Sequence, residues 1–269
     1  MRQFQYSYET SIGFSVPVAD HFFKLRCRPD SFATQSIVNE RLQIDPHEGW
    51  MEGRDSLGNA FVCGSILQPH TFFHCVSEGI VRQEAPYRIP GVVQPLYAYA
   101  SPLTALSDEM AQFLAPFDVR REGVWPTAVA LSEQVHAWLA YTPGATNVDT
   151  TAAAAFRLRQ GVCQDYAHIL IACLRQLGIP ARYVCGLLLG EGATHAWVEV
   201  YDGEAWCGLD PTNRQIIEYG YLKIAHGRDA ADCPVNRGVF RGVAQQQTEV
   251  CVRVHELYES TENENQLKI

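Results

Sequence analysis

The sequence predicts an α+β protein, in which a β-rich N-terminal domain precedes a core of helices packed on an antiparallel sheet. Up to about residue 85, apolar and polar residues alternate with the period of half-buried strands, whereas helical spacing begins only after residue 104. Between them, residues 86–103 contain four prolines, which regular helices and central strands exclude. We therefore expect a β-rich accessory domain at 1–85, a proline-rich linker at 86–103, the core at 104–258 and a disordered tail at 259–269.

The composition is that of an ordinary globular protein, with 47% hydrophobic and 19% charged residues. No stretch approaches the roughly 20 continuous apolar residues of a membrane span, and the N-terminal segment lacks the apolar core of a signal peptide. We therefore expect a cytoplasmic protein that does not enter a membrane. The net charge of −9 and the lack of a basic run argue against nucleic acid as a partner, because clustered Lys and Arg bind phosphate backbones.

The N-terminal region alternates in several short segments. Residues 23–28, 36–44 and 71–76 are expected to form antiparallel strands, and residues 57–60 a hairpin turn. No nucleophile pairs with a base in this region, so the chemistry is expected in the core.

The core begins with helices and ends with strands. Ser107 is a suitable N-cap for a helix up to residue 114, and Pro126 suits the first turn of a helix that runs to about residue 141. Helical spacing resumes at residues 162–177, and Gly178 and Pro180 end that helix. Strands are expected at residues 182–189, 195–201, 205–209 and 248–254.

Nine cysteines raise the question whether one of them is reactive. Their odd number and irregular spacing, without a Cys-x-x-Cys pair, argue against a disulfide framework and a structural zinc site. Cys163 differs from the others because it lies in the first turn of a predicted helix. Backbone N–H groups and the helix dipole stabilise an anion there, which favours a nucleophilic thiolate. The same N–H groups can donate to the oxyanion of a tetrahedral intermediate.

A thiol nucleophile needs a base within hydrogen-bonding reach, and two histidines are candidates. His168 lies five residues further along the same helix, which turns its side chain about 140° away from Cys163. His195 instead opens a strand after a loop, where a side chain can face a cleft. We therefore predict His195 as the base.

Asp210 is predicted to orient His195. If residues 202–203 form a two-residue turn, the strands that it joins place His195 opposite Asp210. The side chains of such a pair point to the same face, so the carboxylate can hold the imidazole. A three-residue turn would move the partner to Pro211.

Taken singly, Cys163, His195 and Asp210 have ordinary structural explanations as a core residue, a packing residue and a turn former. Helix start, strand alternation and hairpin register nevertheless point independently to the same constellation. Glu199 and Asp165 are alternative carboxylates. Glu199 shares a face with His195 but lies two pairs further along, and Asp165 projects about 160° around the helix from Cys163.

A metal site at His70, His74 and Cys75 is the main rival. A four-residue spacing puts two ligands on one face only in a helix, whereas this segment predicts a strand. No metal or cofactor is therefore expected. We expect core positions for three further cysteines: Cys173, Cys185 and Cys207.

Four blocks of the core resemble the bacterial transglutaminase-like family. They are GVCQDYAH (161–168), LGIPARYV (177–184), HAWVEV (195–200) and LDPTN (209–213), and TNVDTT (146–151) just upstream is also similar. The β-rich N-terminal segment resembles, more loosely, the accessory domain that often precedes this core. The likeness covers most of the chain.

The resemblance implies a papain-like core in which Cys163 is the nucleophile, His195 the base and Asp210 the orienting acid. It implies acyl transfer from amides of a peptide or protein substrate through a thioester. We favour hydrolysis, because bacterial members with this architecture are mostly suspected cysteine proteases. Transfer to an amine, use of a small thioester donor and a non-catalytic peptide-binding module stay open. We see none of the acidic clusters that would suggest the calcium site of the animal enzymes.

Overall fold

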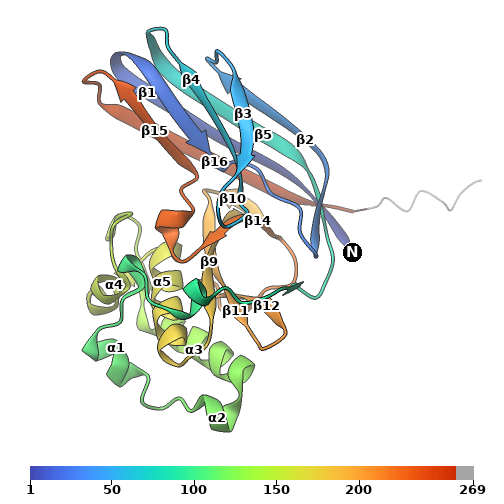
Figure 1. The fold of residues 1–269 in the computed structure, drawn as a ribbon, viewed down its shortest axis with the longest axis vertical. Coiled ribbons are helices and arrows are strands. Elements are labelled where there is room, and N and C mark those ends of the chain that lie inside the picture. The colour runs from blue at the N-terminus through green and yellow to red at the C-terminus, as the bar shows by residue number, and fades with distance from the viewer. Residues whose placement is uncertain (259–269) are drawn as a thin grey trace, which may run out of the picture.

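Strand β1 (Arg2–Leu25) organises the N-terminal part of the molecule. In the computed structural model, which describes residues 1–258, its first half pairs with β5 (His70–Gln83) and β16 (Gln246–Leu257). Its second half pairs with β4 (Ala60–Ile66) and β15 (Asn236–Arg241). β1 therefore joins the strands of an eight-stranded antiparallel arrangement, which forms the upper part of Figure 1.

The remaining strands of this arrangement are β2 (Gln35–Asp45), β3 (Trp50–Arg54) and β10 (Gly190–Gly192). Alternate side chains near the start of β1 are buried, which is the two-residue period that predicts strands. The strands expected at 36–44 and 71–76 are confirmed by β2 and β5.

The last two strands do not belong to the core that was predicted at residues 104–258. β15 and β16 pair with β1 along nearly its whole length, so the end of the chain returns to the N-terminal strands. The predicted domain boundary is wrong at this point, because alternation identifies a strand but not the sheet that it joins. The predicted tail at 259–269 lies outside the described residues.

A six-stranded antiparallel sheet forms the core. In spatial order it contains β13 (Gln215–Ile216), β12 (Ala205–Asp210), β11 (His195–Tyr201), β9 (Ala181–Leu188) and β14 (Tyr221–Gly227). The sixth strand, β6 (Arg88–Pro90), pairs with β12.

Helices cover this sheet in the lower part of Figure 1. The longest are α3 (Val124–Trp138) and α5 (Cys163–Gln176), and α5 packs on β11 and β9. The shorter helices are α1 (Asp108–Phe113), α2 (Val119–Glu122) and α4 (Ala152–Leu158), with 3-10 turns η1 (Pro95–Ala98), η2 (Pro102–Thr104) and η3 (Ala230–Asp232). The α+β fold class is confirmed.

Two helix ends that the sequence predicts are observed. Ser107 caps α1, because its hydroxyl accepts a hydrogen bond from the Met110 N–H at 3.3 Å. Gly178 follows α5 with φ = +77°, the left-handed backbone that favours glycine. A parallel ribbon of β7 (Ala140–Tyr141) and β8 (Gln160–Gly161) leads into the start of α5.

The proline-rich segment at 86–103 is packed into the core and is more than a linker. Tyr87, Ile89 and Tyr97 are buried, and β6 extends the six-stranded sheet at β12. Prolines exclude a helix and a central strand, but they permit an edge strand and 3-10 turns.

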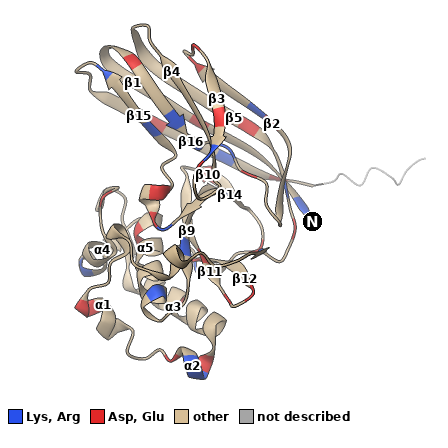
Figure 2. Cartoon of the chain, in the orientation of Figure 1, with Lys and Arg blue, Asp and Glu red and all other residues tan. Residues whose placement is uncertain are grey.

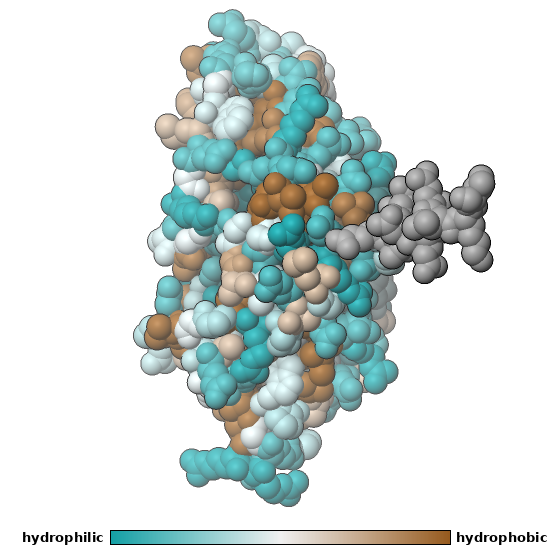
Figure 3. Space-filling model, turned by 90° about the vertical axis from the view of Figure 1, so that its right-hand side faces the viewer, coloured by the Kyte–Doolittle hydropathy of each residue, from teal (hydrophilic) through white to brown (hydrophobic). Residues whose placement is uncertain are grey.

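Charges of both signs are scattered over both parts of the molecule (Figure 2). On the face in Figure 3, hydrophilic and hydrophobic side chains are likewise interspersed. Within residues 1–258, no helix combines the length and apolar character needed to cross a bilayer.

Candidate active site

Cys163 is the first residue of α5 and is only partly buried. The turn before it is fixed by Asp165, whose carboxylate accepts hydrogen bonds from the Val162 N–H at 2.7 Å and the Thr146 hydroxyl at 2.6 Å. Gly161 allows this close approach, because a Cβ there would lie 2.6 Å from a carboxylate oxygen of Asp165. The thiol is therefore held at the positive end of a helix, which favours an anion.

His195 opens β11 beside this helix start. Its Nε2 and the Asp210 carboxylate are 2.8 Å apart, so Nδ1 is the ring nitrogen that remains for the thiol. Burial alone lowers the pKa of His195, but hydrogen bonds and charge from Asp210 and Cys163 raise it to about 9. The imidazole is therefore expected to be protonated at neutral pH beside the thiol.

Asp210 ends β12 and is fully buried. Its Oδ2 contacts His195 and accepts hydrogen bonds from the Asn213 amide at 2.7 Å and the Tyr221 hydroxyl at 2.9 Å. Its Oδ1 accepts from the N–H groups of Thr212 at 2.8 Å and Asn213 at 3.2 Å. Burial raises the pKa of Asp210, but His195 and these donors bring it below the ordinary value, so the carboxylate stays ionised.

The hairpin between β11 and β12 reaches this arrangement by a different register from the predicted one. Tyr201 pairs with Trp206, because the Asp202 carboxylate accepts hydrogen bonds from two backbone N–H groups and widens the turn. The predicted direct pairing of His195 with Asp210 is therefore wrong. The shift is two residues, which keeps every side chain on its face, and Asp210 meets His195 as a diagonal neighbour.

His168 and Asp165 do not compete for these positions. His168 is fully buried, and its Nε2 accepts a hydrogen bond from the Ala230 N–H at 3.1 Å. Burial lowers the pKa of His168 to about 4, so the ring is neutral. Asp165 supports the turn before Cys163, as described above.

Glu199 lies in the second half of β11, within a cluster of buried charges. Its carboxylate is paired with the guanidinium of Arg182 and with the Lys223 ammonium at 2.8 Å, and it accepts from the Tyr87 hydroxyl at 2.6 Å. Burial raises the pKa of Glu199, but the two cations lower it well below its usual range. The sequence shows only that Glu199 shares a strand face with His195. It does not reveal the cations that pair with the Glu199 carboxylate.

The three residues of the alternative metal site each contact a different partner. His70 contacts the His21 ring at 3.1 Å, whereas His74 is paired with Glu9 at 2.9 Å. Cys75 faces another cysteine, Cys27, at 3.9 Å between sulfurs. The core positions predicted for three other cysteines are confirmed, and burial raises the pKa of each to about 12: Cys173, Cys185 and Cys207.

Several residues near the site escaped sequence reasoning. Tyr221 and Asn213 donate to Asp210, and Trp197 stacks with the His195 ring at 6.5 Å between centroids. Tyr141 lies near enough to Cys163 for the charge of the thiol to add to burial in raising the pKa of Tyr141. The tyrosines come from other elements of the chain, and no local pattern marks them.

Two family models match separate parts of this chain. Residues 120–211 match the model of the transglutaminase-like superfamily, and residues 4–82 match that of the bacterial transglutaminase-like N-terminal region. The protein has a transglutaminase-like core preceded by a bacterial transglutaminase-like N-terminal region. The first match contains all three residues of the candidate site, and the second covers most of the N-terminal strands.

Individual relatives of this transglutaminase-like protein differ in how much they share with it. An uncharacterised protein of Mycobacterium tuberculosis is 28% identical over 274 residues, covering 88% of this chain and 87% of its own. A protein-glutamine gamma-glutamyltransferase of Pseudomonas aeruginosa is 33% identical over 159 residues, covering 52% of this chain and 23% of its own. The crystal structure of a suspected cysteine protease from Cytophaga hutchinsonii superposes with a TM-score of 0.78 at 24% identity, covering 96% and 92% of the two chains, which shows the fold.

Proposed function

We propose that this protein is a thiol enzyme that hydrolyses peptide or glutamine amides through a thioester on Cys163. The observation that carries the proposal is the 2.8 Å contact between His195 Nε2 and the buried Asp210 carboxylate, with the Cys163 thiol near enough to help raise the pKa of the same ring. A thiol at a helix start, a base with a raised pKa and a buried anion behind the base are the parts that thiol catalysis needs.

In the first half-reaction, Cys163 Sγ attacks the amide carbonyl carbon, and an electron pair moves onto the carbonyl oxygen. The start of α5 supplies N–H donors for this oxyanion. His195 gives the Nδ1 proton to the amide nitrogen, so the C–N bond breaks and the amine leaves. A thioester on Cys163 and a neutral His195 remain.

In the second half-reaction, His195 takes a proton from water while the water oxygen attacks the thioester carbonyl. The C–S bond then breaks, the carboxylic acid leaves, and the thiolate–imidazolium pair is restored. Asp210 remains ionised throughout, and its contact with Nε2 keeps the ring in one orientation.

Transfer to an amine is the second candidate. It is favoured by the similarity over 159 residues to the Pseudomonas aeruginosa protein-glutamine gamma-glutamyltransferase. The first half-reaction would be the same, and a primary amine would replace water as the group that attacks the thioester.

The first test is alkylation with iodoacetamide at pH 6, with mass spectrometry of all nine cysteine positions. A free thiol with a pKa of about 8.5 reacts slowly at this pH. We expect selective modification of Cys163 that slows at least tenfold in His195→Ala, with the half-buried Cys251 as the internal reference. Modification spread over several cysteines, or an inert Cys163, would favour a non-catalytic binding module.

The second test separates water from amine as the acceptor. A glutamine-rich protein is incubated with the enzyme, with and without a fluorescent primary amine, and ammonia, new N-termini and fluorescent product are measured. Hydrolysis predicts new N-termini or ammonia without incorporation of the amine. Incorporation that rises with amine concentration would support transfer instead.

A further inference from the structure

Strand β14 lies at the edge of the six-stranded sheet, but its edge is not open to water. It pairs with β9 on one side only, and Tyr221 and Lys223 are buried. A buried edge leaves backbone N–H and C=O groups that need hydrogen-bond partners. The neighbouring structure on this side is the N-terminal domain, which supplies those partners from side chains.

Gln83 and Gln35 cover the first part of this edge. The Gln83 amide accepts from the Gly220 N–H at 2.9 Å and donates to the Tyr221 C=O at 2.7 Å. The Gln35 amide accepts from the Lys223 N–H at 3.1 Å and donates to the Lys223 C=O at 3.0 Å. Each side-chain amide thus uses both its oxygen and its nitrogen, as a peptide group in a neighbouring strand would.

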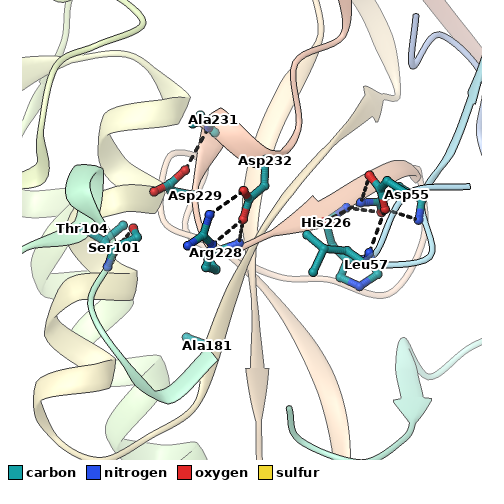
Figure 4. Close-up of polar contacts among 12 residues, drawn as sticks. Asp55, Leu57, Ser101, Thr104, Ala181, His226, Arg228, Asp229, Ala231 and Asp232 are labelled. Atoms are coloured by element: carbon teal, nitrogen blue, oxygen red, sulfur yellow. Dashed lines mark hydrogen bonds and ion pairs between the residues drawn. The ribbon is translucent and has the colours of Figure 1, made fainter. Parts of the chain in front are cut away.

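Asn59 does the same at the far end of the strand. It accepts from the His226 N–H and donates to the His226 C=O, both at 2.8 Å. The Asn59 turn is held by the Asp55 carboxylate, which accepts from the Leu57 N–H at 2.9 Å, and Figure 4 shows Asp55 and Leu57 beside His226.

These three residues, Gln83, Gln35 and Asn59, form an amide ladder that replaces a missing strand along β14. Gln35 and Gln83 are direct cross-strand partners on β2 and β5, so the N-terminal sheet sets the spacing between them. All three are at most 3% exposed, which makes each lost contact costly because a buried polar group is left unpaired.

The ladder is connected to the candidate active site at one end only. Gln83 binds the backbone of Tyr221, and the hydroxyl of the same tyrosine donates to Asp210 at 2.9 Å. Asn59 binds His226 at the other end of β14, away from this contact. The N-terminal domain therefore reaches the carboxylate behind His195 through two consecutive residues, Gln83 and Tyr221.

We propose that Gln83 is a positioning residue for the active site, which fixes Tyr221 and through its hydroxyl the Asp210 carboxylate. A role of Gln83 in catalysis rests on the function proposed above. The N-terminal domain then forms part of the catalytic apparatus without contacting the substrate.

The test compares two ladder residues that make the same kind of contact. In Gln83→Met and Asn59→Leu, an apolar side chain of similar size replaces the amide. The Gly220 N–H and Tyr221 C=O lose their partner in the first variant, and the His226 N–H and C=O in the second. Tyr221→Phe removes only the hydroxyl. The readouts are the pKa of His195 from its ring NMR signals and the pH profile of Cys163 alkylation in the full-length folded protein.

We expect the pKa of His195 to fall by about one unit or more in Gln83→Met and Tyr221→Phe, and to stay within about 0.3 units of wild type in Asn59→Leu. The double variant Gln83→Met/Tyr221→Phe should be no worse than Tyr221→Phe alone, because both act along one path. Equal shifts in Gln83→Met and Asn59→Leu, or additive effects in the double variant, would overturn the proposal.

The same data distinguish this inference from the proposed function. If Cys163 in wild type is not selectively alkylated, the proposed enzyme chemistry fails, while the effect of Gln83→Met on His195 can still be measured. If Cys163 is reactive and Gln83→Met leaves His195 unchanged, the positioning role alone fails. Should Gln83→Met not fold, Gln83→Asn replaces it in the comparison with Asn59→Leu, because the shorter amide cannot reach both the Gly220 N–H and the Tyr221 C=O.

Discussion

Two fully buried carboxylates lie on neighbouring strands of the six-stranded sheet, and their partners differ. Asp210 contacts an imidazole whose pKa is also raised by a partly exposed thiol, that of Cys163. Glu199 is paired with Arg182 and Lys223, which are themselves buried. The partner of Asp210 is a half-buried imidazole that can exchange a proton, whereas the partners of Glu199 are buried cations.

A buried carboxylate with a lowered pKa therefore does not by itself indicate catalysis. Both Asp210 and Glu199 have such a pKa, because cationic partners offset the effect of burial in each case. The chemistry of the partner and its proximity to a nucleophile separate the carboxylate that orients His195 from the carboxylate of the structural ion pair.

The largest effect is expected from removal of the nucleophile. Cys163→Ala should lower amide hydrolysis at least about 1,000-fold, because no other group can form the thioester. Cys251→Ala, which removes another partly buried cysteine, should retain wild-type activity in the same assay. If both variants lost activity to a similar extent, the cause would be damage to the fold and not the loss of the nucleophile.

The next largest effect tests the Asp210 side of the comparison. Asp210→Asn should lower kcat/KM on the order of 100- to 10,000-fold, because an amide cannot stabilise the protonated His195 ring. The measurement is steady-state kinetics on the best amide substrate, with Glu199→Gln as the matched variant. If both variants lost activity equally, the distinction between the two carboxylates would not hold.

Glu199→Gln should act mainly on stability. It leaves two buried cations, Arg182 and Lys223, without their anion, which typically costs about 3–5 kcal/mol of unfolding free energy. Urea unfolding measures this loss, and activity per folded molecule should stay within tenfold of wild type. A stability close to that of wild type would show that the cluster is more hydrated than its burial suggests.

The stability of the protein should depend on pH through His195. The folded-state pKa of His195 is raised to about 9, above its unfolded value of about 6.5. Its stabilising contribution is therefore complete below about pH 6.5 and is lost as pH rises through about 9. The difference in unfolding free energy between wild type and His195→Gln should shrink over this window in urea titrations, and a constant difference would contradict the protonated pair.

The contribution of Asp210 to stability depends on pH in the opposite direction. Its folded-state pKa is lowered, so its contribution is present above the unfolded value of about 3.9 and is lost as pH falls through the folded value. Wild type should therefore lose its stability advantage over Asp210→Asn in acid. Urea unfolding of both proteins between pH 2 and pH 6 measures this convergence.

The smallest effect is expected at the turn before the nucleophile. Thr146→Val removes the hydroxyl that donates to Asp165 and should cost about 1 kcal/mol. Alkylation of Cys163 at pH 6 should slow less than tenfold, because the Val162 N–H still holds Asp165. A larger fall would mean that the turn is set chiefly by the threonine.

The positions of Cys163 and His195 could be predicted because each follows from a local pattern. A glycine before a run of helical spacing marks the helix start, and alternation marks the strand that His195 opens. Asp210 was reached by counting pairs in a hairpin, and the count was wrong by two residues. The prediction of the contact survived because an even shift preserves the face of a strand.

Tyr221, Gln83 and the return of β16 could not be predicted in the same way. Their contacts join parts of the chain that lie far apart in sequence, and Gln83 and Tyr221 are separated by 138 positions. The residues around a glutamine at the end of a strand do not indicate what its side chain binds. It can be hydrogen-bonded to water or to a distant backbone, and the local sequence is the same. The alternation of apolar and polar residues identifies β16 as a strand. It does not identify β1 as the partner of β16, because that pairing depends on the rest of the fold.

The pairing of β16 with β1 has a consequence for biosynthesis. Gln3 is opposite Leu257, so one flank of β1 has no partner until residues 246–257 have left the ribosome. The N-terminal strands therefore cannot complete their sheet first and wait as a finished unit, although synthesis usually lets N-terminal domains fold early. A nascent chain that stops before residue 246 presents a bare strand edge to its neighbours, so we expect shortened products to aggregate or to be degraded.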